Sequence, residues 1–291
     1  MHPPSPGTGE LILPGARLLY QLAGEGFPVV LVHGFGLDMR MWDPQFDSLS
    51  GRFQLIRYDC RGFGMSGEFD PAISYTHAED LLALLDHLGV SAAAVAGLSF
   101  GGRVAMQTAL LAPHRVTALI LLGTVLDGVE WDRDSGAAMA KVDEQVRAGG
   151  VAAGRQAWLA HPLFRPAAED PHLAARLAQM VADYPGQHWL GLDSHRETGP
   201  RPIDALADLT MPTLVISGER DVPCFREMSA VLSAGIPGAD PVEVAGSGHM
   251  VNMEAPEAVS ELIAAFVAGQ ADRHNSATDS SVSPPAQQAP A

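Results

Sequence analysis

The chain of 291 residues is poor in cysteine, in basic residues and in long apolar runs. Its two cysteines, Cys60 and Cys224, could form one disulfide, but in a chain of this size we expect both to be reduced and packed. Lys and Arg number 18 against 34 Asp and Glu, and the net charge of −16 argues against binding to nucleic acid. No apolar run approaches the ~20 residues that cross a bilayer, so we expect no membrane-spanning segment.

Signals for export, metals and cofactors are also missing from the sequence. Residues 1–6 lack the basic start and apolar core of a signal peptide, which predicts a cytoplasmic protein. The 11 histidines are scattered, with no His-Glu-x-x-His pair and no cysteine cluster. Neither a phosphate-binding loop nor a dinucleotide fingerprint is present. The sequence therefore predicts chemistry without a metal or a cofactor.

The most informative stretch is residues 97–101, Gly-Leu-Ser-Phe-Gly, which follows an apolar run over 92–96 and precedes a helical pattern. A serine on so sharp a strand-to-helix turn projects its hydroxyl away from the backbone. Both flanking positions then require very small residues, here Gly97 and Gly101. The start of the following helix brings free N–H groups and partial positive charge to the same place. The pattern predicts that Ser99 is a nucleophile.

A serine hydroxyl needs a base to activate it, and the base needs an acid to orient it. A short apolar strand ends in a turn that carries Asp221, the predicted acid. The next strand, over 242–244, leads into a glycine-rich loop that carries His249, the predicted base. The order Ser, Asp, His is the one that accompanies a nucleophile between strand and helix. Glu219 and Asp127 stay open as alternative acids, because each also follows a predicted strand.

Two further motifs stand in the expected order. The sequence His-Gly-Phe-Gly at 33–36 follows an apolar strand, and Asp-Cys-Arg-Gly-Phe-Gly-Met-Ser at 59–66 follows the next one. With the serine turn, the acid and the base, they identify the chain as a member of the α/β-hydrolase superfamily, in its capped serine-hydrolase branch. The resemblance covers about 29–267 and is strongest to enol-lactonases and small-molecule esterases.

The resemblance implies an oxyanion hole made of two backbone N–H groups, those of Phe35 and Phe100. Their rings can either shape the substrate pocket or simply pack. We expect His33 to brace its loop through hydrogen bonds to the backbone and not to act in acid–base chemistry. Asp59 and Arg61 are expected to brace the neighbouring loop, by pairing with each other or with nearby main chain.

Strand and helix patterns alternate along the chain, which predicts an α/β fold with a mostly parallel, doubly wound sheet. We expect a hydrolase core over 1–123 and 202–268, a helical cap over 124–201 and a disordered tail over 269–291. The expected elements include a leading hairpin at 11–22, a helix behind the capping pair Thr76 and Glu79, cap helices near 135–148, 152–159 and 171–184, and a final helix at 256–267.

Three of the four tryptophans, Trp131, Trp158 and Trp189, lie in the predicted cap. Each can line a pocket for an apolar or aromatic substrate or belong to the cap's own small core. The cap histidines are expected to be surface or packing residues: His161, His188 and His195.

We therefore predict a serine hydrolase that cleaves a small-molecule ester or lactone through an acyl-enzyme on Ser99. A hydrolase of carbon–carbon bonds in ring-cleavage products uses the same three residues and is the nearest alternative. Thioester cleavage, amide cleavage and perhydrolysis also stay open. A ligand receptor or lyase on the same scaffold is an alternative of a different class. The sequence favours neither a monomer nor a homo-oligomer.

Overall fold

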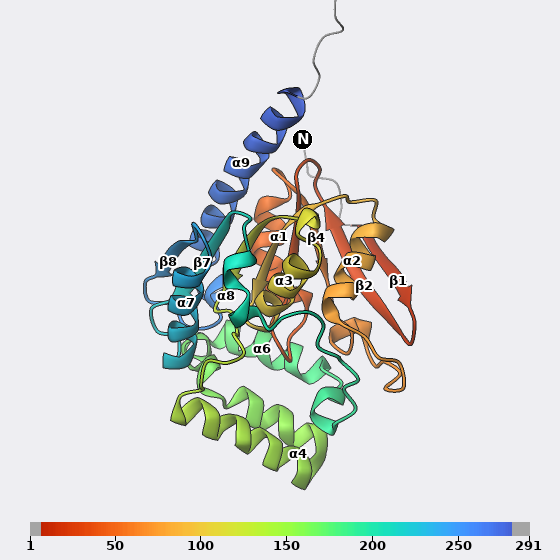
Figure 1. Cartoon of the computed structure of the whole chain (residues 1–291). Coiled ribbons are helices and arrows are strands. Elements are labelled where there is room, and N and C mark those ends of the chain that lie inside the picture. Colours follow the sequence, from red (N-terminus) through yellow and green to blue (C-terminus); the bar gives the residue numbers. More distant parts are fainter. Residues whose placement is uncertain (1–6, 281–291) are drawn as a thin grey trace, which may run out of the picture.

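The structure, a computed structural model, describes residues 7–280 of the chain, and side chains up to residue 271. Within this range eight strands form one sheet in the order β1-β2-β4-β3-β5-β6-β7-β8 (Figure 1). Strands β1 and β2 form the predicted antiparallel hairpin, β2 is antiparallel to β4, and all other neighbours are parallel. The strands are β1 (Gly7–Leu13), β2 (Ala16–Ala23), β3 (Pro28–Val32), β4 (Gln54–Tyr58), β5 (Ala93–Leu98), β6 (Val116–Leu122), β7 (Thr213–Gly218) and β8 (Asp240–Val244).

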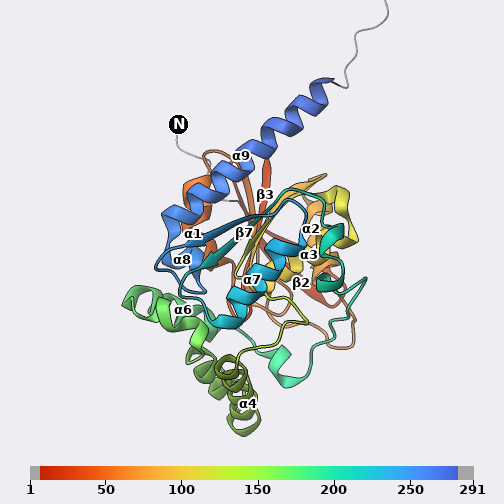
Figure 2. The ribbon, with the colours of Figure 1, turned by 60° about the vertical axis from the view of Figure 1, so that its left-hand side comes forward.

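Helices cover both faces of the sheet, which confirms the predicted α/β class. The helices are α1 (Asp43–Leu49), α2 (His77–His87), α3 (Phe100–Leu111), α4 (Arg133–Leu159), α5 (Arg165–Ala168), α6 (Pro171–Asp183), α7 (Pro223–Gly235), α8 (Val251–Glu254) and α9 (Pro256–Ser280). Figure 2 shows α1 and α9 on one face, and α2, α3 and α7 on the other.

The central strands are fully buried because helices cover them on both sides. Three runs at the middle of the sheet have no exposed surface: residues 29–32, 93–96 and 118–122. Their sequences are continuously apolar and do not alternate between apolar and polar residues, as is typical of parallel strands packed on both faces. Side chains of these runs form the hydrophobic core, which holds the loops at the ends of the strands in fixed positions.

Helix α2 begins where the capping pattern predicted it. Thr76 Oγ1 accepts a hydrogen bond from the backbone N of Glu79 at 3.0 Å, and the Thr76 hydroxyl lies 2.9 Å from Glu79 Oε2. This cap satisfies one of the four N–H groups that the first turn of a helix leaves unpaired. Three leucines of the helix are fully buried: Leu81, Leu84 and Leu85.

After β6 the chain leaves the sheet, forms α4, α5 and α6, and returns at β7 (Figure 1). The helical insertion is therefore present as predicted. Helix α4 spans 27 residues, but Gly150 has a non-helical backbone with φ 70° and ψ −167°. Two helices thus meet at Gly150, in agreement with the separate helices expected near 135–148 and 152–159. Helix α6 corresponds to the third predicted cap helix.

The C-terminal helix differs from the prediction. Helix α9 continues to Ser280, whereas the apolar pattern predicted an end near Val267 and a disordered segment from residue 269. The apolar residues of the helix recur at helical spacing only up to Val267, which is why the pattern ended there. No proline stands before Pro284, so backbone hydrogen bonding can continue the helix past the end of the apolar pattern. The rest of the predicted tail, 281–291, lies outside the described residues.

Both cysteines are buried and unpaired, as expected: Cys60 and Cys224. None of the helices in the described part of the chain combines the length and the apolar character needed to cross a membrane.

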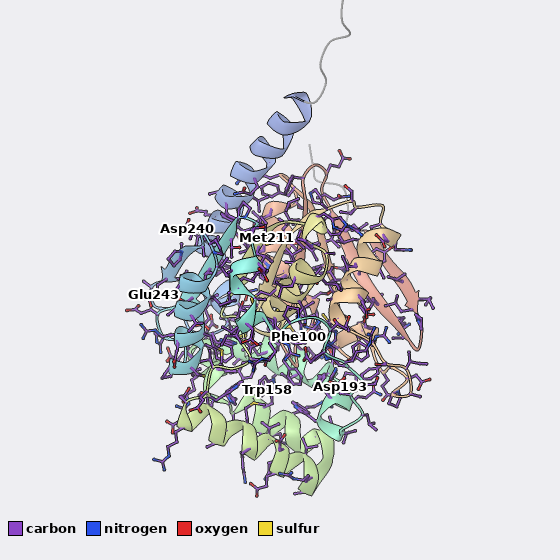
Figure 3. The ribbon with its side chains drawn as sticks, viewed as in Figure 1. Phe100, Trp158, Asp193, Met211, Asp240 and Glu243 are labelled. Carbon is purple, nitrogen blue, oxygen red and sulfur yellow. The ribbon has the colours of Figure 1, made fainter. Side chains whose placement is uncertain are left out.

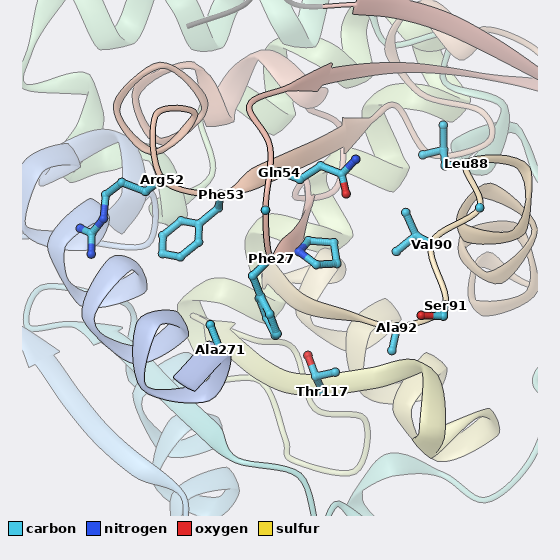
Figure 4. Close-up of a pocket in the computed structure, with 13 residues that line it drawn as sticks. Phe27, Arg52, Phe53, Gln54, Leu88, Val90, Ser91, Ala92, Thr117 and Ala271 are labelled. Carbon is cyan, nitrogen blue, oxygen red and sulfur yellow. The ribbon is translucent and has the colours of Figure 1, made fainter. Parts of the chain in front are cut away.

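A cavity of about 560 Å³ lies at the N-terminal ends of β3, β4 and β5 (Figure 4). Its lining includes Phe27, Gln54, Val90, Thr117 and Ala271. In parallel sheets the functional loops stand at the opposite, carboxyl ends of the strands. The predicted nucleophile, acid and base all follow carboxyl ends, so this cavity does not belong to the candidate site.

The cap on α2 generates a stability prediction. Changing Thr76→Ala removes the side-chain acceptor and should lower the free energy of unfolding by about 1 kcal/mol. Thr76→Ser keeps the hydroxyl and should recover most of this loss. Urea unfolding followed by circular dichroism measures both variants. Equal losses for the two variants would contradict a capping role for the hydroxyl.

Candidate active site

Ser99 stands at the turn between β5 and α3, in a backbone conformation that is costly for any residue other than glycine. Its φ is 56° and its ψ −114°, and it is the sole non-glycine residue with a positive φ between residues 7 and 280. Such a conformation costs about 1–3 kcal/mol and persists only where the surroundings enforce it. The Ser99 backbone N donates a hydrogen bond to the Leu122 carbonyl at 2.8 Å, which ties the turn to the end of β6.

Three glycines around Ser99 allow this turn. A Cβ on Gly97 would lie 2.2 Å from the carbonyl carbon of Gly101, and one on Gly101 would lie 2.2 Å from the carbonyl oxygen of Val32. A Cβ on Gly102 would lie 2.0 Å from Thr124 Oγ1. All three contacts are with atoms that a methyl group would overlap. The predicted requirement for very small residues at Gly97 and Gly101 is thus explained by the packing, and the structure adds Gly102 to it.

The predicted acid and base are in direct contact. His249 Nδ1 donates to Asp221 Oδ2 at 2.9 Å, and both residues are buried. The other oxygen of Asp221 accepts from the backbone N of Val222 at 2.7 Å. An ionised carboxylate only accepts hydrogen bonds, so it selects the imidazole form with hydrogen on Nδ1. This leaves Nε2 of His249 as the ring nitrogen free for proton transfer.

Gly123, the residue after β6, contacts the acid–base pair and directly follows Leu122, whose carbonyl accepts the hydrogen bond of the Ser99 backbone N. A Cβ on Gly123 would lie 3.1 Å from His249 Nδ1 and 3.3 Å from Asp221 Oδ2, so the acid–base pair packs directly on this glycine. On the other side, the carbonyl of Ser99 accepts from the backbone N of Val125 at 3.3 Å. Within the described residues no hydrogen bond joins the Ser99 hydroxyl to His249. Such bonds are often long in enzymes without substrate.

The alternative acids lie elsewhere. Asp127 is 3.2 Å from Arg103 and is partly exposed. Glu219 Oε2 accepts from the backbone N of Gly246 at 2.8 Å, so it holds the turn before the histidine and not the histidine itself. Of the three candidate carboxylates, the structure brings Asp221 to the imidazole.

Glu254 is a residue that the sequence reasoning missed. Its carboxylate accepts from the backbone N of Gly248 at 2.7 Å and from that of Met250 at 3.0 Å, one residue on each side of His249. Burial raises the pKa of the Glu254 carboxyl above its usual value, while the two backbone hydrogen bonds lower it. Its sequence signal was a carboxylate five residues after the histidine. The loop that carries His249 is therefore held from both sides.

The backbone N–H groups of Phe35 and Phe100 make no hydrogen bond within residues 7–280. Both residues are partly exposed, as is Ser99. Phe100 is the first residue of α3, so its N–H points out of the helix start, where the helix dipole is positive. Both N–H groups are therefore unpaired donors, and one of them belongs to the residue that directly follows Ser99.

Both ring nitrogens of His33 are hydrogen-bonded to the backbone of nearby loops. Nδ1 donates to the Gly34 carbonyl at 2.8 Å, and Nε2 accepts from the backbone N of Cys60 at 2.9 Å. The ring is buried, which lowers the pKa of His33 below its usual value. A neutral imidazole with no free nitrogen braces the loop and is not available for proton transfer, in agreement with the sequence interpretation.

The two charged residues of the loop after β4, Asp59 and Arg61, do not pair with each other and have different partners. Asp59 accepts from the backbone N of Met39 at 2.8 Å and from that of Met65 at 2.7 Å. Burial raises the pKa of Asp59 to about 7. Arg61 pairs with Asp80 at 2.8 Å. Of the two expected arrangements, Asp59 thus uses the main chain, and Arg61 takes a different carboxylate as its partner.

The cap tryptophans divide into two places. Trp158 and Trp189 pack against the ring of Phe35, with centroids 5.8 and 6.2 Å away. Trp131 is one-third exposed and instead packs edge-on against Phe225 at 5.5 Å, whose own ring is 4.2 Å from that of His249. In Figure 3, Trp158 lies at the junction of cap and core.

The junction is lined by further rings. Phe63, Tyr184 and His188 lie 5.4, 5.6 and 5.8 Å from the Phe35 ring. Phe100, labelled in Figure 3 on the core side of the same junction, is 6.3 Å from it. The Phe35 ring is therefore packed by aromatic rings from both the core and the helical insertion.

The cap histidines make no hydrogen bond to the predicted acid or base. His161 is buried: Nε2 donates to the Ser135 carbonyl at 3.2 Å and Nδ1 accepts from the backbone N of Leu163 at 3.2 Å. His188 Nδ1 lies 2.9 Å from the Tyr184 hydroxyl. His195 stacks on His77, with centroids 5.2 Å apart. Among the residues described, no three His, Cys, Asp or Glu side chains are grouped so as to hold a metal ion.

Comparison with known proteins gives a consistent family. Residues 28–256 match the family model described as the alpha/beta hydrolase fold. A protein of Azorhizobium caulinodans described as a carbamate hydrolase, RutD, is 33% identical over 266 residues, 86% of this chain and 95% of that protein. The 3-oxoadipate enol-lactonase 1 of Acinetobacter baylyi is 27% identical over 260 residues, 87% of this chain and 94% of the lactonase.

Solved structures extend the similarity to the whole fold. A thermophilic esterase from Thermogutta terrifontis superposes with a TM-score of 0.76 at 29% identity, over 91% of this chain and 99% of the esterase. An enol-lactonase from Burkholderia xenovorans superposes with a TM-score of 0.74 at 25% identity, over 89% of this chain and all of the lactonase.

Burial of His161 generates a pH prediction. Burial lowers the pKa of His161 to about 4, against about 6.5 in the unfolded chain. As the pH falls from 6.5 to 4, His161 becomes protonated in the unfolded state but stays neutral in the folded state, so the free energy of unfolding decreases. The slope is up to ~1.4 kcal/mol per pH unit. His161→Asn keeps an acceptor for the Leu163 N–H but does not titrate, so its free energy of unfolding should fall less over this range.

Urea unfolding at pH steps from 7 to 4 gives the free energy of unfolding of the wild type and of His161→Asn as a function of pH. In the difference between these two curves the contributions of all other titrating groups cancel. His114→Asn, at an exposed histidine, is the matched control and should follow the wild type. Parallel curves for wild type and His161→Asn would show that burial does not keep this imidazole neutral.

Proposed function

The chain belongs to the α/β-hydrolase fold family, and on that premise we propose that it is a serine hydrolase of small-molecule esters or lactones. One observation carries the proposal. The strained turn at Ser99 is hydrogen-bonded to Leu122, and the hydrogen-bonded pair of Asp221 and His249 packs on Gly123, the next residue along the chain. The backbone N–H groups of Phe35 and Phe100 are unpaired among the described residues. Acyl transfer needs this combination of a nucleophile, a base, an acid and an oxyanion site.

In the proposed reaction Ser99 Oγ attacks the carbonyl carbon of the substrate while His249 Nε2 takes the hydroxyl proton. The N–H groups of Phe35 and Phe100 donate to the oxyanion that forms. His249 then gives the proton to the leaving oxygen, and the bond between the acyl carbon and that oxygen breaks. A water molecule, deprotonated by His249, hydrolyses the acyl-enzyme. Asp221 stabilises the imidazolium in both steps.

Phe35, Trp158 and Trp189 form the proposed wall of the substrate pocket. Their rings enclose the space beside the oxyanion donors, which suits an apolar or aromatic acyl group. Trp131 lies on the Phe225 side of His249 and is left out of this wall. The reaction as proposed uses the chain's own residues and a water molecule, with no cofactor or metal.

A carbamate is the second candidate substrate, because the RutD protein of Azorhizobium caulinodans is 33% identical and is described as a carbamate hydrolase. The same serine, imidazole and oxyanion donors serve that reaction, and the leaving atom can be nitrogen. Initial rates on aryl esters, lactones, carbamates and vinylogous diketones separate these reactions from one another and from carbon–carbon cleavage. Saturable binding without turnover of any of them would favour the receptor alternative.

Modification of Ser99 tests the nucleophile. A fluorophosphonate probe should label the protein at Ser99 alone, as peptide mass spectrometry can determine. Ser99→Ala should remove the label and lower kcat by about a millionfold on the best ester of the panel. Labelling of another serine, or turnover that survives Ser99→Ala, is incompatible with the proposed acyl-enzyme.

Substitution of the two carboxylates tests the acid. Asp221→Asn preserves the shape of the side chain but leaves the imidazole in the wrong tautomer, so kcat should fall by about 10⁴-fold. Asp127→Asn, the matched control, removes a charge that is paired with Arg103 and should change kcat less than threefold. The assignment of the acid is wrong if the two variants exchange these effects.

A further inference from the structure

Four buried nitrogen atoms around Phe35 and Phe100 have no hydrogen-bond partner. They are His77 Nδ1, Trp158 Nε1, His188 Nε2 and Trp189 Nε1. They belong to a set of eleven buried, unpartnered side-chain atoms in the described structure, so about a third of that set gathers at one place. A buried polar atom without a partner costs about 1–3 kcal/mol, which makes such a concentration expensive unless something else binds there.

The four rings pack around Phe35 and Phe100, the residues of the two proposed oxyanion donors. Trp158, Trp189 and His188 lie 5.8, 6.2 and 5.8 Å from the Phe35 ring, centroid to centroid. His77, the first residue of α2, lies 4.9 Å from the ring of Phe100, the residue after the proposed nucleophile. His77 and Trp158 are each about 95% buried.

The two imidazoles are close enough to share one ligand atom. The ring centroids of His77 and His188 are 6.5 Å apart. A ring nitrogen stands ~1 Å from its centroid and a hydrogen bond adds ~2.9 Å, so one oxygen atom can reach both rings across this distance.

These nitrogens can all donate without carrying charge, because no hydrogen bond of the described structure fixes the tautomer of His77 and its hydrogen can stand on Nδ1. An indole N–H can only donate. His188 Nδ1 contacts the Tyr184 hydroxyl at 2.9 Å, and when that hydroxyl donates, the hydrogen of the imidazole stands on Nε2, the unpartnered atom. Burial lowers the pKa of His188 to about 4 and that of His77 well below its usual value, so both rings are neutral at pH 7.

Among the described contacts, no Lys or Arg side chain pairs with His77, His188, Trp158 or Trp189. Three arginines of nearby segments have partners of their own. Arg61 pairs with Asp80, Arg103 with Asp127 and Glu197, and Arg155 donates to the Tyr184 carbonyl. A carboxylate that entered the space would lose its hydration without gaining an opposite charge. A carbonyl oxygen costs far less to desolvate and accepts two hydrogen bonds.

We propose that His77 and His188 form a subsite for a second, uncharged carbonyl oxygen on the acyl part of the substrate, while Trp158 and Trp189 pack on the neighbouring Phe35 ring. The leaving group must meet His249, whose ring packs on Phe225, so the opposite side, around Phe35, is the acyl side. The enzyme therefore prefers oxo-acyl esters and lactones to hydrocarbon or carboxylated ones. This inference rests on the proposed function, because it places the acyl group relative to Ser99.

Three ethyl esters that differ at one position test the subsite: ethyl 4-oxopentanoate, ethyl 4-methylpentanoate and monoethyl succinate. Release of ethanol gives kcat/KM for each with the wild-type protein. The oxo ester should exceed the methyl isostere by about tenfold, a difference expected for a buried site whose donors are otherwise left unpaired. Monoethyl succinate should be the poorest of the three.

His77→Phe and His188→Phe replace each imidazole with a ring that has no nitrogen, and each should lower the ratio of oxo to methyl ester at least threefold. His172→Phe, an exposed histidine of the cap, is the matched control and should keep the wild-type ratio. Fluorophosphonate labelling of Ser99 in each variant establishes that the site has folded.

A wild-type ratio near one would overturn the subsite, as would preference for the succinate ester or a ratio unchanged in both histidine variants. In each of these cases labelling and turnover would leave the hydrolase proposal standing. A wild-type protein that is neither labelled at Ser99 nor active on any ester would overturn the proposed function instead, and the subsite with it.

Discussion

The sharp turn at Ser99 is the constraint on which the rest of the site depends. A serine with φ 56° is unfavourable on its own, and the fold supports it by packing three glycines against neighbouring backbone and side-chain atoms. This close approach sets α3 directly behind the serine and aims the start of that helix at the same space. The proposed nucleophile, one proposed oxyanion donor and the positive helix end are thus fixed by the same backbone turn.

Parallel topology then supplies the remaining groups. Strands β3, β5, β6 and β7 are neighbours in the sheet, and the loops after their carboxyl ends carry Phe35, Ser99, Gly123 and Asp221. His249 arrives from the loop after β8, which Glu254 holds through the two flanking backbone N–H groups. Residues separated by up to 214 positions therefore meet because the strands that precede them lie side by side. The helical insertion after β6 packs aromatic rings against Phe35 of the core.

Local patterns were enough to predict much of this arrangement. Each of three patterns reflects a short-range requirement: the glycines around a serine, the capping pair at Thr76 and the continuous apolar runs. The structure has the predicted turn, helix start and buried strands at these places. Less could be predicted where the determinant lies far away in sequence. Gly123 is important because the acid–base pair packs on it, and Glu254 because it accepts hydrogen bonds from the loop of His249. Helix α9 extends past the apolar pattern, where no proline interrupts it. The unpaired imidazole nitrogens of His77 and His188 likewise become visible only once the rings around them are placed.

The most direct measurement of the central claim is a crystal structure of the protein after reaction with a small alkyl fluorophosphonate. We expect phosphorus bonded to Ser99 Oγ, the phosphoryl oxygen within hydrogen-bond distance of the backbone N of Phe35 and of Phe100, and His249 Nε2 facing the Ser99 Oγ atom, with Asp221 still on Nδ1. An adduct whose phosphoryl oxygen points away from both N–H groups, with the imidazole out of reach of Ser99, would contradict the account.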